Sequence, residues 1–310
     1  MLLIVVLALG AALLYGTADF FSGVAARRIA VLVATTINYA VATVVLVIVV
    51  LTVGGVWSTT AIASGVTAGL LAAVGFLTFT AALAAGPISL LTPLIALLSS
   101  AVPVVVALVL GDHLAPIAWV AVVVAILGSV LIGLERRVDT RSAKPRTLLF
   151  AAISGLAFGF ATVALDLAPG DAGMVAVFLD TTSGLVLLLV LLGLARVVPA
   201  MRRAMAVLDA HQADDEPATG SAQRAAVAAA DPRRRARLLA AGAGLLIGGA
   251  NVLLMLALHE GSVAVVAVLV NLYPVATVLL AWIVLRERIN AVQGTGVVLA
   301  VAASVMLGLV

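Results

Sequence analysis

The chain has 310 residues, of which 65% are hydrophobic and 10% are charged, and its formal net charge is +3. Soluble domains have about 25% charged residues, and a water-soluble fold of this size has no way to bury so much apolar surface. The composition therefore excludes a soluble protein and predicts an integral membrane protein. The absence of cysteine excludes disulfides, thiolate metal sites and cysteine nucleophiles.

Apolar segments of about 20 residues, the length that crosses roughly 30 Å of hydrocarbon as a helix, follow one another along the chain. Strands are not expected, because the segments lack the alternation of a lipid-facing barrel and a helix satisfies its own backbone amides in lipid. The sequence therefore predicts an all-α membrane protein with ten transmembrane helices. Breaks at glycine, proline and charged residues place the helices at 2–24, 30–53, 61–84, 88–111, 115–134, 147–168, 172–194, 236–258, 262–285 and 290–309.

One connection, near 195–235, is much longer and more polar than the others. A short amphipathic helix is expected near 199–210, at its beginning. The segment has two interpretations, a regulatory tail or a solvated linker whose arginines orient the protein in the membrane. We favour the linker.

Basic residues occur only in the odd-numbered connections between the predicted helices. The 17 residues are Arg27, Arg28, Arg136, Arg137, Arg141, Lys144, Arg146, Arg196, Arg202, Arg203, Arg224, Arg233, Arg234, Arg235, Arg237, Arg286 and Arg288. Because lysine and arginine are retained on the cytoplasmic side, this pattern predicts cytoplasmic odd-numbered loops and both termini outside. The predominance of arginine over lysine suggests a bacterial protein, and hence the bacterial plasma (inner) membrane.

The two halves of the sequence resemble each other. A shift of 175 residues places Gly69-Leu70-Leu71 on Gly244-Leu245-Leu246 and Asp112 on Glu287 without a gap, and a weaker match at 143 relates the starts of the halves. The sequence therefore predicts a first repeat at 1–134, a basic connecting loop at 135–146 and a second repeat at 147–310. Five helices are an odd number, so the second repeat crosses the membrane in the opposite sense, as in many secondary transporters.

A set of short motifs resembles the EamA-type transporters of the drug/metabolite transporter superfamily. They are Tyr15-Gly16 in the first repeat and Ala257-Leu258, Gly261, Pro274, Leu285-Arg286-Glu287-Arg288, Gln293-Gly294 and Gly296 in the second. The first repeat departs from this pattern, since Ser99 occupies the position of Pro274. The resemblance implies two five-helix repeats whose first four helices line a cavity, and transport of amino acids, drugs, sugars or other metabolites. It also implies cytoplasmic termini, contrary to the arginine pattern.

Two acidic residues fall inside predicted helices, where charge is costly and usually faces a cavity or a partner. Asp180 lies about 12 Å into the seventh helix at 1.5 Å per residue, and Thr181 follows it. We expect Asp180 to bind a proton or a cation, the alternative being a structural hydrogen bond. Asp19, near the end of the first helix, has the same role or forms an ion pair with Arg27 or Arg28.

Other polar residues in the predicted helices are candidates for binding substrate, or equally for joining helices by hydrogen bonds. They are Asn38, Tyr39, Asn251, Asn271 and Tyr273. Prolines remove a backbone hydrogen bond and kink helices. Hinges are therefore expected at Pro274, Pro93 and Pro103.

Three GxxxG spacings are expected to be sites of close helix packing. They are Gly65/Gly69, Gly155/Gly159 and Gly244/Gly248. The sequence has no P-loop, GxSxG or complete HExxH motif. We therefore expect that the protein is not an enzyme and that it binds no cofactor and no metal ion.

We expect a secondary-active transporter, most readily an efflux protein, for small metabolites or drugs. The alternative is a scaffold or lipid-binding subunit that transports nothing. The expected partners are the lipid bilayer, a small-molecule substrate and protons, and no nucleic acid.

Overall fold

The computed structural model describes residues 2–26, 28–85, 88–111, 116–133, 145–209, 232–276 and 291–308. Helix accounts for 91% of the structure, and the described part contains no strand. The predicted all-helical class is therefore confirmed. The physical reason is that hydrocarbon offers no partner for a backbone amide, so each segment forms its own hydrogen bonds.

The helices follow the predicted segments closely. Those of the first half are α1 (Leu2–Ala26), α2 (Val31–Val53), α3 (Thr59–Ala85), α4 (Ile88–Val109) and α5 (Pro116–Gly133). Those of the second half are α6 (Pro145–Asp166), the 3-10 turn η2 (Gly170–Ala172), α7 (Val175–Val197), α8 (Pro199–Asp209), α10 (Pro232–Glu260), α11 (Val263–Val270) and α13 (Ala291–Gly308). The short helix expected near 199–210 is confirmed as α8.

Six of the described helices are long and apolar enough to cross a membrane, namely α1, α2, α3, α6, α7 and α10. Shorter apolar helical stretches lie within α4, α5, α13 and the segment 263–276. The structure thus supports several membrane spans. Most of the predicted loop at 195–235 and the second half of the predicted ninth helix lie outside the described residues.

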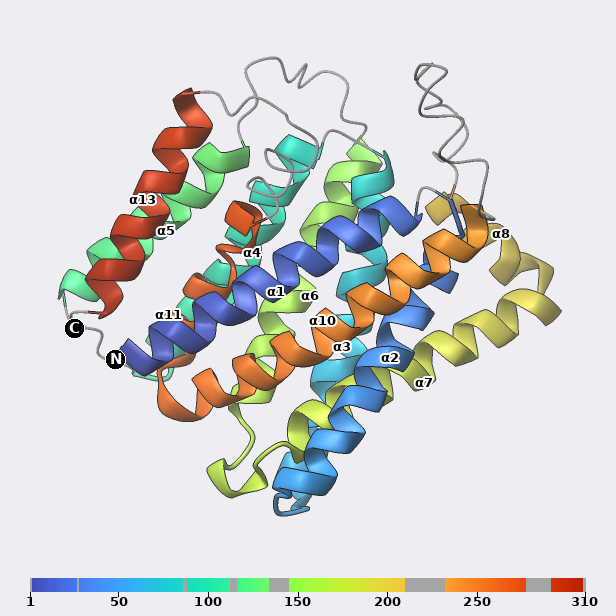
Figure 1. Cartoon of the computed structure of the whole chain (residues 1–310), viewed down its shortest axis with the longest axis horizontal. Helices are drawn as coiled ribbons and strands as arrows, with labels where there is room; N and C mark the ends of the chain where they lie inside the picture. The colour runs from blue at the N-terminus through green and yellow to red at the C-terminus, as the bar shows by residue number, and fades with distance from the viewer. Residues whose placement is uncertain are drawn as a thin grey trace.

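The helices pack in an order that interleaves the two halves of the chain. In Figure 1, α1 lies beside α10, and α5 pairs with α13 at the edge that holds both termini. The other main contacts join α3 to α6 and α7, α2 to α7 and α10, α4 to α6, and α11 to α1 and α4. The helix ends that carry the described arginines lie on the opposite side of the bundle from the termini (Figure 1).

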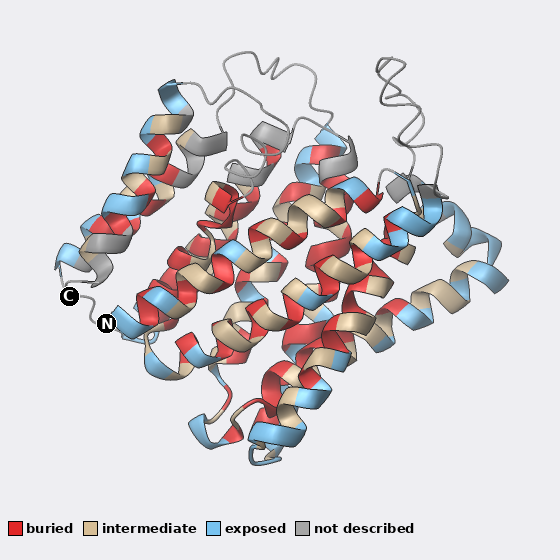
Figure 2. Cartoon of the chain, viewed as in Figure 1, coloured by how far each residue is buried: buried red, intermediate tan, exposed pale blue. Residues whose placement is uncertain are grey.

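The surface of the bundle is apolar, as the outside of a membrane protein must be. Figure 2 shows buried residues concentrated where helices face one another. Large aliphatic side chains are exposed on the outer faces, for example Leu51 at 79% and Val109 at 80%. In water this surface would drive aggregation, whereas in a bilayer it contacts lipid chains.

The three glycine pairs all lie against a neighbouring helix, which confirms the packing prediction. A Cβ atom added to Gly69 on α3 would lie 2.7 Å from the carbonyl carbon of Asp180 on α7. One added to Gly244 on α10 would lie 2.8 Å from the Cβ of Val41 on α2. The pair on α6 contacts α4 in the same way. Small residues are needed because the backbones approach too closely for a side chain.

On the side of the bundle away from the arginines, a loop of the first half is tied to a loop of the second. The Val56 amide donates to the Asp171 carbonyl at 2.9 Å, and the rings of Trp57 and Phe178 are 6.0 Å apart between centroids. These contacts join the α2–α3 connection to the start of α7.

Candidate functional site

Tyr15 on α1 is the centre of the polar interior. Its hydroxyl donates a hydrogen bond to the side-chain oxygen of Asn251 on α10. The ring also packs against each of the three largest apolar clusters. Residue-by-residue reasoning did not select Tyr15 as a site residue, although it begins the motif Tyr15-Gly16. Its signal was a polar aromatic residue in the interior of an apolar span.

The Asp180 carboxyl group lies in this interior, on α7. The side chain is 5% exposed, and Oδ1 forms no hydrogen bond with any described residue. Tyr15 and Tyr39 both lie within electrostatic range of the carboxyl group. Asp180 therefore occupies the contact of α3 with α7, in the neighbourhood of tyrosines from α1 and α2. Such a carboxyl group can hold a proton or attract a cation.

Asp19 lies one helical turn from Tyr15 on the same helix. It is within electrostatic range of Tyr15 and of Tyr273, which is contributed by the segment after α11. No ion pair joins Asp19 to Arg28 in the described structure, and Arg27 lies outside the described residues. Tyr15 is thus a shared neighbour of two carboxyl groups on different helices.

The candidates Asn38 and Thr181 have their polar atoms occupied by protein groups. Asn38 is fully buried, and its amide oxygen accepts from Ser22 Oγ at 2.9 Å. We orient the amide so that its nitrogen donates to the Ala240 carbonyl of α10 at 2.7 Å, because this satisfies both ends. Thr181 Oγ1 donates to the Phe178 carbonyl of its own helix at 3.1 Å. In this arrangement Asn38 joins three helices.

An aromatic cluster adjoins the polar interior and joins α2, α3 and α6. The Tyr39 ring packs edge-on against Phe76 with centroids 6.2 Å apart. Phe158 of α6 packs edge-on against Phe76 at 6.5 Å and against Phe79 at 6.1 Å. Aromatic faces favour apolar or cationic groups. This cluster was not predicted, because its members are far apart in sequence.

The predicted ninth helix, which begins with α11, is interrupted just before Pro274. Regular helix ends at Val270, Asn271 and Leu272 form a turn, and helical structure resumes at 273–276. Proline has no amide hydrogen, so the Val270 carbonyl lacks its usual donor. By contrast, α4 continues as one helix through Pro93 and Pro103. The structure therefore places a break at one of the three expected hinges.

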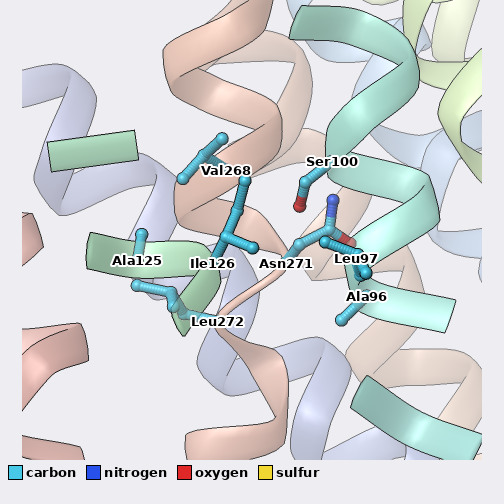
Figure 3. Close-up of a pocket in the computed structure, with 8 residues that line it drawn as sticks. All are labelled: Ala96, Leu97, Ser100, Ala125, Ile126, Val268, Asn271 and Leu272. Carbon is cyan, nitrogen blue, oxygen red and sulfur yellow. The ribbon is translucent and has the colours of Figure 1, made fainter. Parts of the chain in front are cut away.

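Asn271 in this turn joins the two halves. Its side-chain oxygen accepts from Ser99 Oγ on α4 at 2.8 Å. Beside it lies a small cavity of about 10 Å³, into which Ser100 and Asn271 project and which Ile126 and Val268 help to close (Figure 3). That volume is near the lower limit for one water molecule. A second cavity of about 190 Å³ is an entirely apolar groove between α4 and α6.

The comparisons with known proteins agree with this architecture. Residues 221–309 match the family model of the EamA-like transporter family. Over this part, about the last third of its length, the chain is similar to the EamA-like transporters. The match covers the helices that carry Gly261, Pro274 and Gly294, where the sequence motifs are clearest, and it confirms the predicted resemblance. The EamA family is a family of transporters and not of enzymes.

A solved crystal structure has a fold similar to that of this chain. It aligns with a TM-score of 0.65 and 16% sequence identity over 99% of this chain and 96% of the other. At this identity the likeness concerns the fold alone. No curated protein matches the sequence. Within the described residues, no group of three or more histidine or acidic side chains forms a metal site.

Proposed function

We propose that this protein is a secondary-active transporter, in the direction of export, for small metabolites or drugs. It works by alternating access between two inverted five-helix repeats, 1–134 and 147–310. The contact pattern supports this proposal when α6, α7, α10, α11 and α13 are matched in order with α1 to α5. The contacts α1–α10, α2–α10 and α1–α11 then have the counterparts α6–α3, α7–α3 and α6–α4, while α2–α7, α4–α11 and α5–α13 pair equivalents.

The observation that carries the proposal is a buried oxygen of Asp180, at a contact between the repeats, that has no hydrogen-bond partner among the described residues. Burying a carboxylate without a partner is unfavourable, so the group must be neutralised by a proton or by a cationic group. The described arginines lie at helix ends and leave this requirement to a ligand. Asp180 is the coupling residue in this proposal, with Asp19 as a second carboxyl group across Tyr15.

Transport requires a second conformation, because the described cavities do not provide a metabolite-sized polar space at Asp180. The broken helix after α11 supplies the hinge, and the Ser99–Asn271 bond is one contact that changes. A scaffold that transports nothing would also lack a metabolite-sized polar cavity at Asp180, so the scaffold is the second candidate. Labelling of single cysteines from both sides of the membrane separates the two, since the native chain contains no cysteine.

The principal experiment compares metabolite export by cells that lack or overproduce the protein, followed by uptake of the identified substrate into proteoliposomes. We expect Asp180→Asn to reduce uphill transport at least tenfold while passive exchange of substrate persists. The matched control is Asp171→Asn, because Asp171 is exposed in a loop. Full uphill transport by Asp180→Asn would contradict the coupling role, and absence of transport by the wild type would support the scaffold.

For the orientation, we propose that the arginine-bearing side faces the cytoplasm of a bacterial cell and that both termini lie outside. The support is the restriction of all 17 basic residues to alternate connections. Fusion of a reporter that is active only in the cytoplasm to the C-terminus tests this orientation, and strong activity would reverse it.

A further inference from the structure

We propose that α8 and the arginines around it form a binding surface for the headgroups of anionic phospholipids. The helices α8 and α10 both contact α2. The members of this arginine surface lie at the end of α7, on α8 and at the start of α10 and are all exposed: Arg196, Arg202, Arg203, Arg233, Arg234, Arg235 and Arg237. Between residues 196 and 237 the sequence holds eight arginines and five acidic residues, so eight minus five leaves a net charge of +3. The inference does not depend on transport.

The helix α8 has the form of a helix that lies on a membrane. It has 11 residues, about 17 Å at 1.5 Å per residue, which is too short to cross roughly 30 Å of hydrocarbon. Met201 and Met205 are half-buried, and Met205 packs on the cluster that contains Tyr39. Arg202 and Arg203 are exposed. The methionine face thus packs on the bundle and leaves the basic side chains exposed, where long arginine side chains can reach lipid headgroups.

The arginines lie at the level where the helices leave the hydrocarbon. On α7, Arg196 is next to Val197, whose side chain is 81% exposed. On α10, Arg237 is next to Leu238, whose side chain is 64% exposed. Exposed aliphatic residues contact lipid chains, so arginines within the same helical turn reach the phosphate layer. This level favours a phospholipid over a soluble anion or a nucleic acid.

The beginning of α10 adds a reason for an anionic partner. The first six residues of the helix include four arginines and no acidic residue. Basic side chains repel the positive end of the helix dipole. Asp231, directly before the helix, is the acidic residue nearest to them in the sequence, and the arginines outnumber it four to one. Lipid phosphates beside these arginines would relieve the repulsion.

Lipid binding at this surface would act on the polar interior. A single residue, Val198, separates α8 from α7, the helix that carries Asp180. Met205 of α8 packs against the same apolar cluster that contains Leu188 of α7. Headgroups bound to α8 would therefore hold the end of α7 and stabilise the described conformation.

The test uses the purified full chain in neutral detergent, titrated with dioleoylphosphatidylglycerol or dioleoylphosphatidylcholine. Lipid retention is measured by native mass spectrometry, and the melting temperature is followed in parallel. Each arginine near an anionic surface contributes a factor of about five, so R202Q/R203Q should bind phosphatidylglycerol roughly 25-fold more weakly. R234Q/R235Q should show a similar loss. The control R136Q/R137Q removes as many arginines from the connection between α5 and α6, two helices that do not have α8 among their main neighbours, and should change the affinity less than threefold.

We also expect 0.5 M salt to weaken the binding by screening, and inorganic phosphate to leave the melting temperature unchanged. Equal retention of the two lipids by the wild type would overturn the proposal. So would an equal loss in R136Q/R137Q, which would show general attraction to the basic side. Stabilisation by inorganic phosphate would also overturn it, because it would show a site for a soluble anion.

Discussion

Substitution of Gly69 by alanine tests the contact that positions Asp180. The added Cβ would lie 2.7 Å from the Asp180 carbonyl carbon and closer still to its oxygen. Carbon atoms pack at about 3.5–4.0 Å, so α3 and α7 must separate locally by about 1 Å. Overpacking of this kind costs about 1–3 kcal/mol. Alanine recovers up to about 1 kcal/mol of helix propensity, so the net loss is smaller than the packing cost.

The control that isolates the packing cost is Gly193→Ala on α7. An added Cβ there has no atom within 4 Å, so the variant gains helix propensity without a clash. The difference in stability between the two variants is then the packing cost itself, about 1–3 kcal/mol. At roughly 2–4 °C per kcal/mol for a large domain, Gly69→Ala should melt about 2–12 °C below Gly193→Ala.

The assay is thermal unfolding in detergent, followed by intrinsic fluorescence, with transport measured on the same preparations. Movement of α7 displaces Asp180, so Gly69→Ala should also lower transport once a substrate is known. Identical melting of Gly69→Ala and Gly193→Ala would refute the close approach of α3 to α7.

Three further predictions concern individual contacts between helices. Tyr15→Phe leaves the Asn251 amide without its donor, so unfolding in detergent should show a loss of about 1–3 kcal/mol, partly recovered by adding Asn251→Leu. Ser99→Ala removes the bond to the turn after α11, and hydrogen exchange should rise in 270–276 and stay unchanged in α7. Replacing Trp57 and Phe178, with rings 6.0 Å apart, by cysteine should let a short thiol cross-linker stop transport, with either single variant unaffected.

Hydropathy and small-residue spacing were sufficient to predict the class, the helix positions and the close packing at the glycine pairs. These properties are local: about 20 apolar residues must become a helix in lipid, and a backbone that meets another backbone must lack a side chain there. The agreement extends to α8, whose alternating methionines and arginines are visible in the sequence.

Only the tertiary structure decided which polar side chains remain available to a ligand. Asn38 and Asp180 look alike in sequence, each a polar residue in an apolar span, but Asn38 is bonded to Ser22 while Asp180 Oδ1 has no described partner. Likewise, a hinge was expected at each of three prolines, but the helix is broken only at Pro274 and continues through Pro93 and Pro103. Groups from helices distant in sequence decide whether a polar side chain finds a hydrogen-bond partner and whether a helix continues through a proline. The spacing of residues within one helix does not contain that information.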